Sequence, residues 1–297
     1  MFIKRVKNRL LMYRNLFVKV IVNIKNPILF IIKKGKMGIN KDESRNVKVI
    51  VSLTSYPERM KLGKLHKCLK SLLLQNYRPD KIILYLGKEK FTNYSIPNEV
   101  NELKKYGLEI CFVEDLKPHT KYFYSLQEYN DACVVTVDDD CYYSPNLLSD
   151  LVKAHEEYPK SIICTRGHFI KFQNKEILPY NNWEYETKEF NYESHFILAT
   201  GVGGVLYPPN ALPKEAFDKN KLTKLALRQD DLWLKIMEII GNVKVVAIPS
   251  YKTKYVVGIL GSERVNLFSG NVINNENDSY IFNLLSNYHI KYEDFEK

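Results

Sequence analysis

From residue 47 onward, strand-like segments alternate with helix-like segments, and this order restricts the fold more than any other feature of the chain. The strand-like segments are the apolar runs 47–55, 81–87, 108–115 and 132–137. The helix-like segments between them have apolar residues at helical spacing, and they cover residues 62–73, 99–106 and 120–129. Repeated strand–helix–strand units predict an α/β fold, in which a mostly parallel sheet carries helices on both faces.

The first forty residues are strongly basic. The chain has a net charge of +10, and eleven of its Lys and Arg residues precede Asp42, its first acidic residue. Apolar residues recur at helical spacing from Ile3 to Ile24, which predicts a basic amphipathic helix that ends near Asn26–Pro27, because a proline disfavours continuation. The longest uninterrupted apolar run, 28–32, is far shorter than the roughly 20 residues that span a bilayer, which argues against a transmembrane segment.

This basic segment has two interpretations. It packs on the main domain as a solvated helix, or it binds an anionic membrane surface. We expect no nucleic-acid partner, since the basic residues beyond the segment are interspersed with acids. The five cysteines are odd in number and lack CxxC spacing, which predicts reduced thiols in the cytoplasm rather than disulfides or a zinc site.

Three consecutive carboxylates, Asp138, Asp139 and Asp140, follow the fourth predicted strand in VVTVDDD. In parallel sheets ligands bind at the carboxyl ends of the strands. Adjacent carboxylates near a dry core need a cation or hydrogen-bond donors to stay ionised. Magnesium and manganese prefer such oxygens, and magnesium typically uses one or two carboxylates together with phosphates. The run therefore favours a metal-bridged diphosphate; the alternative is a capped turn, because Ser144 and Pro145 are expected to begin the next helix.

Three other segments have the composition of a binding site. TSYPER (54–59) offers hydroxyls, a ring and an arginine, although Ser55 and Glu58 also fit a helix capping box. TGVGGVLYPP (200–209) places glycines in a strand-like run, which indicates a bulge or the close approach of a ligand. RQDDLWL (228–234) begins a helix with Asp230 and Asp231, whose charges also complement the helix dipole.

In this order, VSLTSYPER, VTVDDD, TGVGGVLYPP and RQDDLWL resemble the GT-A (Rossmann-like) glycosyltransferases, most closely the family 2-like bacterial enzymes of surface-polysaccharide synthesis. The resemblance covers about residues 47–260. It implies metal-dependent transfer of a sugar, with inversion, from a nucleotide-sugar donor that we expect to be UDP-linked. The acceptor would be a hydroxyl of a glycan or of a lipid-linked saccharide.

The resemblance also implies residue roles. Asp138 would contact the ribose, Asp140 together with Asp138 would bind Mn²⁺ or Mg²⁺, and Asp139 would assist either group. Asp231 is the first choice for the general base and Asp230 the second. The remaining nucleotide-sugar-binding candidates are Thr54, Ser55, Tyr56, Arg59, Asp115 and Lys121. The candidates for the sugar and acceptor side are Gly201, Gly203, Gly204, Trp183 and His168, with Trp183 expected in a polar loop where it can stack on a sugar.

Three segments are expected: a basic amphipathic segment (1–45), a GT-A domain (46–265) and a C-terminal helical extension (266–297). The expected location is the cytoplasm, with peripheral attachment to the inner face of the plasma membrane. Two other functions use the same features. A nucleotidyltransferase or metal-dependent phosphohydrolase would need a basic glycine-rich phosphate loop after the first strand, which TSYPERMKLGK is not. A catalytically inactive, membrane-associated binding protein would use mainly the basic segment.

Overall fold

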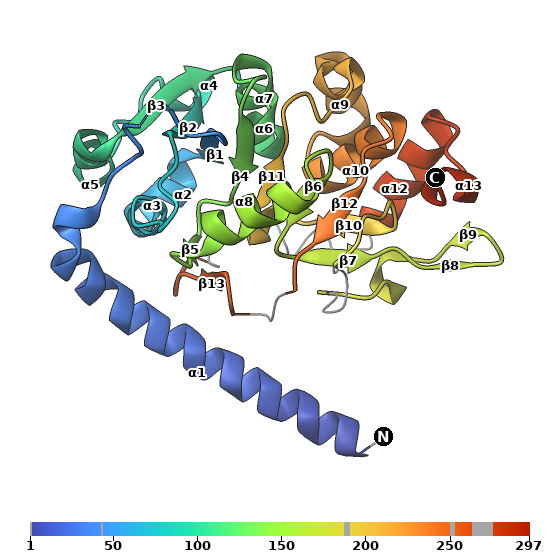
Figure 1. The fold of residues 1–297 in the computed structure, drawn as a ribbon, viewed down its shortest axis with the longest axis horizontal. Coiled ribbons are helices and arrows are strands. Elements are labelled where there is room, and N and C mark those ends of the chain that lie inside the picture. The colour runs from blue at the N-terminus through green and yellow to red at the C-terminus, as the bar shows by residue number, and fades with distance from the viewer. Residues whose placement is uncertain (1, 43, 187–190, 250–252, 263–275) are drawn as a thin grey trace.

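A seven-stranded sheet forms the centre of the protein (Figure 1). The computed structural model describes residues 2–42, 44–186, 191–249, 253–262 and 276–297. Within these residues the strand order is β12-β6-β11-β4-β1-β2-β3. Only β11 runs antiparallel to its neighbours β4 and β6, and the other pairs are parallel. The predicted α/β fold with a mostly parallel sheet is therefore confirmed.

The bounds of the elements are close to those predicted. The strands of the large sheet are β1 (Val49–Ser55), β2 (Lys81–Gly87), β3 (Leu108–Val113), β4 (Cys133–Thr136), β6 (Ile162–Cys164), β11 (Val205–Tyr207) and β12 (Val245–Ala247). Three two-stranded sheets pair β5 (Cys141–Tyr143) with β13 (Val256–Gly258), β7 (Gly167–Phe169) with β10 (Ile197–Ala199), and β8 (Phe172–Gln173) with β9 (Glu176–Ile177). The α-helices are α1 (Phe2–Ile32), α2 (Pro57–Lys61), α3 (Leu65–Leu72), α4 (Lys88–Phe91), α5 (Asn98–Asn101), α6 (Thr120–Phe123), α7 (Ser125–Glu128), α8 (Leu147–Glu157), α9 (Lys219–Ala226), α10 (Asp230–Ile240), α12 (Glu276–Asn287) and α13 (Tyr292–Phe295). Short 3₁₀ turns are η1 (Lys34–Lys36), η2 (Glu102–Tyr106), η3 (Lys117–His119), η4 (Tyr180–Asn182), η5 (Gly201–Gly203) and η6 (Lys214–Phe217).

Alternate residues of the strands enter two different cores. Val51 and Leu84 pack in the core that includes residues of α3 and α8. Ile50 and Ile83 lie in the opposite core, beneath residues of α6 and α7. Farther along the sheet, residues of α9, α10 and α12 cover that same side with β6, β11 and β12. The period-2 alternation of a strand therefore buries both faces of the sheet, which explains the continuous apolar runs in the sequence.

Several helix predictions need correction. The helix predicted across residues 120–129 is divided at Tyr124 into α6 and α7. The helix predicted across residues 62–73 is divided, because Gly63 adopts φ +62° between α2 and α3. The helix expected to start at Ser144–Pro145 begins only at Leu147, because the Ser144 carbonyl accepts the Leu147 N–H in a preceding turn (3.0 Å). By contrast, Gly107 ends η2 with φ +104°, as predicted.

The N-terminal helix α1 is longer than the sequence predicted. It continues through Pro27 to Ile32, so the expected end near Asn26–Pro27 is wrong (Figure 1). A proline removes one helical hydrogen bond, but Phe30 beyond it is buried, with its ring 6.0 Å from that of Tyr142. This packing compensates for the lost bond and holds the last turn of α1 on the domain.

The extended helix also changes the membrane interpretation. Met12–Ile32 is long and apolar enough, by length and composition alone, to cross a membrane, and it is the one such helix among the described residues. The argument against a transmembrane segment considered only uninterrupted apolar residues and a helix that ended at Pro27. The uninterrupted run 28–32 therefore understates the apolar length of the helix, which adds an apolar turn beyond Pro27.

Between Met12 and Ile32, α1 turns a row of large apolar side chains away from the domain, while Asn23 and Phe30 contact the domain. The Asn23 amide donates to the Gly258 carbonyl (3.1 Å) and accepts the Leu260 N–H (2.8 Å). Over residues 12–32, the exposed side chains of α1 are mostly large and apolar, among them Tyr13, Phe17, Val20, Ile21, Ile24, Ile28 and Ile31. A helix on the surface of a globular protein normally has the reverse orientation, with its apolar stripe against the core.

The C-terminal helices pack on the main domain. α12 and α13 bury Ile281, Leu284 and Phe295 in the core beside α9 and α10. Residues 266–275 of the expected C-terminal extension lie outside the described residues, and the three segment boundaries stay a prediction.

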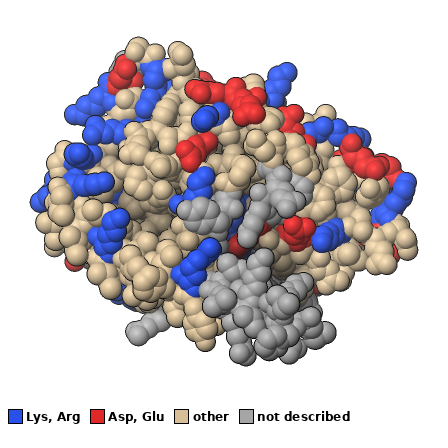
Figure 2. Space-filling model, turned by 60° about the horizontal axis from the view of Figure 1, so that its bottom comes forward, with Lys and Arg blue, Asp and Glu red and all other residues tan. Residues whose placement is uncertain are grey.

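All five cysteines are free thiols. On the described part of the face in Figure 2, Lys and Arg lie in several separate groups rather than one continuous stripe.

Candidate functional site

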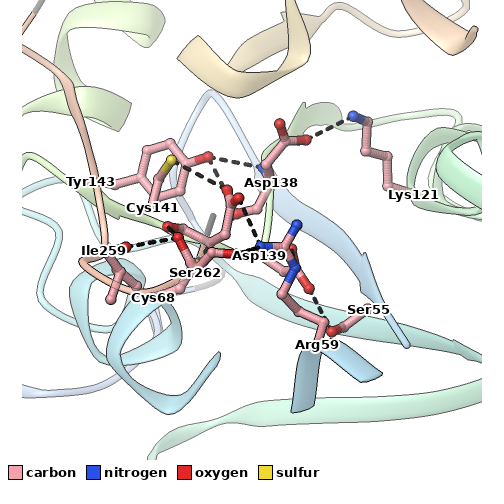
Figure 3. A network of polar contacts seen from close by, with 11 residues as sticks. Ser55, Arg59, Cys68, Lys121, Asp138, Asp139, Cys141, Tyr143, Ile259 and Ser262 are labelled. Atoms are coloured by element: carbon pink, nitrogen blue, oxygen red, sulfur yellow. Dashed lines mark hydrogen bonds and ion pairs between the residues drawn. The ribbon is translucent and has the colours of Figure 1, made fainter. Parts of the chain in front are cut away.

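The three consecutive aspartates point in different directions at the carboxyl end of β4. Asp139 turns inward, where its carboxylate accepts the Ser55 hydroxyl (2.5 Å) and lies 3.5 Å from Arg59 Nε (Figure 3). The side chains of Asp138 and Asp140 are 35% and 23% exposed, whereas that of Asp139 is 9% exposed. Burial raises the pKa of Asp139 to about 7, against the opposing effects of Arg59 and Ser55. Asp139 therefore contacts Ser55 and Arg59 inside the protein, and this differs from the expected contact with the nucleotide.

Arg59 is the cation that pairs with the second and third aspartates. Its Nη1 lies 3.0 Å from Asp140 Oδ2 and donates to the Ser262 carbonyl (2.8 Å). Its side chain is buried, with the guanidinium 5.8 Å from the Tyr56 ring. Burial acts to lower the pKa of Arg59, but Asp139 and Asp140 raise it overall.

The TSYPER segment connects the end of β1 to these aspartates. Ser55 uses its hydroxyl for Asp139, and the N-terminus of α2 at Tyr56 has no side-chain cap, so the capping-box alternative is wrong. Pro57 does occupy the first turn of α2, as expected. The Thr54 hydroxyl donates to the Tyr85 carbonyl (3.0 Å), which leaves Thr54 half-buried between β1 and β2.

Two residues that sequence reasoning missed hold the aspartate segment in place. The Tyr143 hydroxyl accepts the Asp138 N–H (2.8 Å) and donates to the Val202 carbonyl in η5 (3.2 Å). The Ser262 hydroxyl donates to the Asp140 carbonyl (3.3 Å), which also accepts the Ile259 N–H (2.9 Å). Tyr143 lies in β5 directly after the acids, and the apolar alternation of Cys141–Tyr143 was the available signal.

Lys121 lies between the aspartate run and the two acids of α10 that are the candidates for the general base. Its Nζ is 3.0 Å from Asp138 Oδ1 and 2.9 Å from Asp230 Oδ2, and its side chain is 7% exposed. Burial acts to lower the pKa of Lys121, but Asp138 and Asp230 raise it well above its ordinary value. Lys121 is therefore a buried ammonium shared by acids from β4 and α10.

The two acids at the start of α10 have opposite electrostatic surroundings. Burial acts to raise the pKa of Asp230, but Lys121 and His119 hold it below its ordinary value. Burial and the charge of Asp230 raise the pKa of Asp231 to about 8, although its Oδ1 accepts the Gly201 N–H (3.1 Å). A carboxylate with a pKa near neutrality is suited to proton transfer. The helix itself is confirmed, with both acids in its first turn and Gly241 at its end.

The glycine segment is not one bulged strand, as the sequence had indicated. β10 pairs with β7 and β11 joins the large sheet, and η5 connects the two strands. Because β11 is antiparallel, its first residue Val205 pairs with Thr136 at the end of β4. Gly201, Gly203 and Gly204 therefore lie at the carboxyl edge of the sheet beside the acids. Gly203 has no room for a side chain, since an added Cβ would lie 2.6 Å from the Arg166 Cβ.

Two expected acceptor-side residues are buried instead. Trp183 is 4% exposed, and its indole N–H donates to the Leu178 carbonyl (2.7 Å). Its ring therefore packs in the core, which contradicts the expectation that Trp183 stacks on a sugar. His168 is 2% exposed, its Nδ1 accepts the Glu186 N–H (3.1 Å), and burial lowers its pKa to about 3. His168 is a neutral core side chain, which corrects its expected acceptor or metal role.

Asp115 follows β3 but belongs to a separate group of charges. Its carboxylate pairs with Lys117 (2.6 Å), with Lys90 at 4.0 Å, and it accepts the Lys117 N–H (2.9 Å). β3 is the edge strand, and β1 and β2 separate it from β4. The structure therefore gathers Ser55, Arg59, Lys121 and the acids into one site, and it leaves Asp115 at the border.

Comparisons with known proteins were made for sequence and structure. No curated protein matches the chain. S. aureus TarS 1-349 in complex with UDP has 14% sequence identity and a TM-score of 0.45, over 71% of this chain and 60% of TarS. The mannosyltransferase PcManGT from Pyrobaculum calidifontis, in complex with GDP-Man and Mn2+, has 13% identity and a TM-score of 0.44, over 82% of this chain and 70% of PcManGT.

The sequence family model gives the family. Glycosyl transferase family 2 matches residues 53–220, more than half of the 297 residues. The matched region begins within β1 and contains the aspartate run and the glycine segment, and it ends ten residues before α10 begins at Asp230. The chain is therefore a member of glycosyl transferase family 2.

Proposed function

We propose that the protein is a metal-dependent, inverting glycosyltransferase that transfers a sugar from a UDP-linked donor to a hydroxyl of a surface-glycan acceptor. The observation that carries the proposal is the arrangement around Lys121. This side chain joins Asp138, on the proposed donor side, to Asp230, next to the proposed base Asp231. A donor site and a base at one edge of the sheet are the two parts that displacement at an anomeric carbon requires.

The exposed aspartates have the chemistry that a divalent metal needs. Asp138 and Asp140 are the two more exposed acids, and each uses one carboxylate oxygen for a cation of the chain, Lys121 or Arg59. No cluster of three or more His, Cys, Asp or Glu ligands occurs among the described residues. Magnesium needs only one or two carboxylates when phosphates supply other ligands, so the pair fits Mg²⁺ or Mn²⁺. When bound, the ion would supply positive charge to the departing nucleoside diphosphate.

The chain's own residues would do the remaining work at the donor. Asp138 would accept a hydrogen bond from the ribose, and Tyr56 would contribute its ring from the end of β1. Arg59 and Ser55 keep Asp139 inside, so that the backbone presents its two neighbours outward. This division supports Asp138 and Asp140 as the two acids of the DxD motif.

Asp231 would act as the general base. Its carboxylate takes the proton of the acceptor hydroxyl while the hydroxyl oxygen attacks the anomeric carbon and the bond to the diphosphate breaks. Attack from the side opposite the leaving group inverts the anomeric centre. Asp230 is the weaker candidate, because it is paired with Lys121 and its pKa is held low by Lys121 and His119 despite its burial.

α1 supports attachment to the inner face of the plasma membrane. Its polar residue Asn23 is occupied by the domain, and its exposed side is apolar. Apolar residues that face away from a protein fit the hydrocarbon boundary of a bilayer, and nearby lysines such as Lys33 and Lys34 fit anionic headgroups. A cytoplasmic enzyme held in this way would reach a lipid-linked saccharide acceptor.

A turnover assay tests the proposed function. The full-length protein is incubated with Mn²⁺ or Mg²⁺ and a panel of sugar nucleotides, and nucleoside diphosphate release is measured with and without saccharide acceptors. We expect release from one sugar nucleotide that is stimulated by an acceptor and lost in Asp140→Ala. Release of pyrophosphate or inorganic phosphate would instead indicate a nucleotidyltransferase or phosphohydrolase. Unchanged release by Asp140→Ala would contradict the metal assignment.

A further inference from the structure

Lys121 has too many fixed contacts to be explained as a nucleotide ligand alone. Its ammonium is the shared partner of Asp138 and Asp230, at 3.0 and 2.9 Å, and almost none of the side chain reaches solvent. Asp138 follows β4 and Asp230 starts α10, so the ion pairs connect two elements that are distant in the sequence. Lys121 therefore lies across the boundary between the donor acids and the base helix.

The backbone of Lys121 is also held from two sides. Its carbonyl accepts the Ser52 hydroxyl from β1, and it accepts the Ser125 hydroxyl as well (2.9 Å). Ser52 is fully buried in a central strand of the sheet. The starting point of the lysine side chain is thus fixed relative to the sheet, which is the condition for one side chain to define the position of another.

Gly201 provides the space that this arrangement needs. A Cβ at Gly201 would lie 2.6 Å from Lys121 Nζ and 3.4 Å from Asp231 Oδ1. The N–H of the same glycine donates to Asp231 Oδ1 (3.1 Å). The lysine and the proposed base therefore pack against one residue without a side chain, and a methyl group there would displace the ammonium.

We propose that Lys121 is a positioning residue that ties Asp138 to the start of α10 and thereby fixes Asp231 relative to the departing nucleotide. This inference rests on the proposed function. It differs from the sequence expectation, in which Lys121 binds the donor phosphate or base. A positioning residue affects the rate of the chemical step, whereas a phosphate ligand affects donor affinity.

The test separates donor affinity from turnover. Binding of UDP with Mn²⁺, or of the diphosphate that the wild type releases, is measured by calorimetry for the wild type and Lys121→Met. We expect a dissociation constant within about threefold of the wild type and a kcat at saturating donor lower by about 100-fold, the usual cost of a small misplacement. A tenfold weaker diphosphate affinity with unchanged kcat would overturn the inference and assign Lys121 to the donor.

A second variant keeps every charge. In Gly201→Ala the added methyl must displace Lys121 Nζ, so we expect the same pattern of lower kcat and retained diphosphate affinity. Asp230→Asn removes one partner of the lysine. Because Lys121→Met and Asp230→Asn break the same ion pair, the loss of kcat in the double variant should be smaller than the product of the two single losses. Fully multiplicative losses, or wild-type kcat in Gly201→Ala, would contradict a positioning role.

A matched control addresses folding. Lys235 and Glu238 form another buried ion pair on α10 (2.6 Å), so Lys235→Met also leaves a buried acid unpaired. We expect it to lower the melting temperature as Lys121→Met does but to leave kcat unchanged. An equal loss of kcat in Lys235→Met would mean that loss of a buried lysine, not its position, reduces turnover. Absence of nucleoside diphosphate release by the wild type would refute the proposed function itself, whereas the positioning inference fails only through the comparisons among active variants.

Discussion

At the scale of single residues, the aspartate run combines three carboxylates with three different surroundings. Asp139 is enclosed by Ser55 and Arg59, and Asp138 and Asp140 each have a chain cation on one oxygen. Removing two charges from water costs several kcal/mol per ion unless partners compensate. Arg59 and Lys121 supply that compensation within the protein, so the acids can remain close together before any ligand binds.

The raised pKa of Asp231 gives a pH prediction for activity. Burial and Asp230 raise it to about 8, so in the free enzyme the carboxyl is mostly protonated at pH 7 and becomes a base as the pH rises. We expect kcat/KM to increase through about pH 8 and then level off. Asp231→Asn should lose roughly 100- to 10,000-fold in turnover, as for a general base, and lose this pH dependence. A wild-type profile that is flat between pH 6 and 9 would contradict the assignment.

The raised pKa of Asp231 also predicts how the stability of the fold changes with pH. The pKa of Asp231 is about 8 in the folded protein against an ordinary value of 3.8, so between these values the folded state holds a proton that the unfolded state has released. Its contribution to the free energy of unfolding therefore falls as the pH rises from about 4 to about 8. We expect Asp231→Asn to gain in melting temperature relative to the wild type from pH 5 to pH 9. A constant difference across this range would exclude the shift.

At the scale of elements, a short segment joins α1 to the aspartate run. Asn23 on α1 bonds to the Gly258 carbonyl and the Leu260 N–H, and between them Ile259 donates its N–H to the Asp140 carbonyl. β13 in turn pairs with β5, which follows Asp140 directly. One segment therefore contacts α1 on one side and the proposed metal ligand Asp140 on the other.

Hydrogen exchange at Leu260 and Ile259 can measure separately how the contact with α1 and the contact with Asp140 open. In Asn23→Ala the Leu260 N–H loses its acceptor, while the Ile259 N–H keeps the Asp140 carbonyl. We expect exchange at Leu260 to accelerate at least tenfold and exchange at Ile259 to remain within about threefold of the wild type, as local opening without global unfolding. Equal acceleration at both amides would show that α1 and the aspartate segment open as one unit.

At the scale of the whole molecule, the sheet buries its apolar side chains, whereas the N-terminal helix exposes many of its own. The sheet buries both faces under helices, whereas α1 leaves a row of large apolar side chains exposed. An exposed contiguous apolar surface marks an interaction site rather than a stable solvated face. Deleting residues 1–40 is a poor test of that site, because it would remove Phe30 and Met37 from the core.

Substitution of the exposed row tests membrane binding without loss of the core. Phe17, Ile24 and Ile28 are 67%, 64% and 54% exposed, so the variant Phe17→Glu, Ile24→Glu, Ile28→Glu keeps the contacts of Phe30. Each buried apolar side chain contributes about 1.5 kcal/mol or more, so partition into anionic vesicles should fall more than ~100-fold. Flotation with vesicles measures this loss, and the melting temperature checks the fold. The exposed Lys175→Glu on another face is the control, and equal flotation of all three proteins would rule out α1 as the membrane contact.

The alternating order of strands and helices, and the placement of the acids at strand and helix ends, could be predicted from the amino-acid sequence. These features depend on apolar periodicity and on local signals such as Gly107 and Gly241, which act within a few residues. The fold decided that Ser55 binds Asp139, 84 residues away, instead of capping α2. It also decided that Trp183 is buried and that Lys121 stands between Asp138 and Asp230. Burial and charge pairing depend on which elements meet in space, and no local pattern along the chain contains that information.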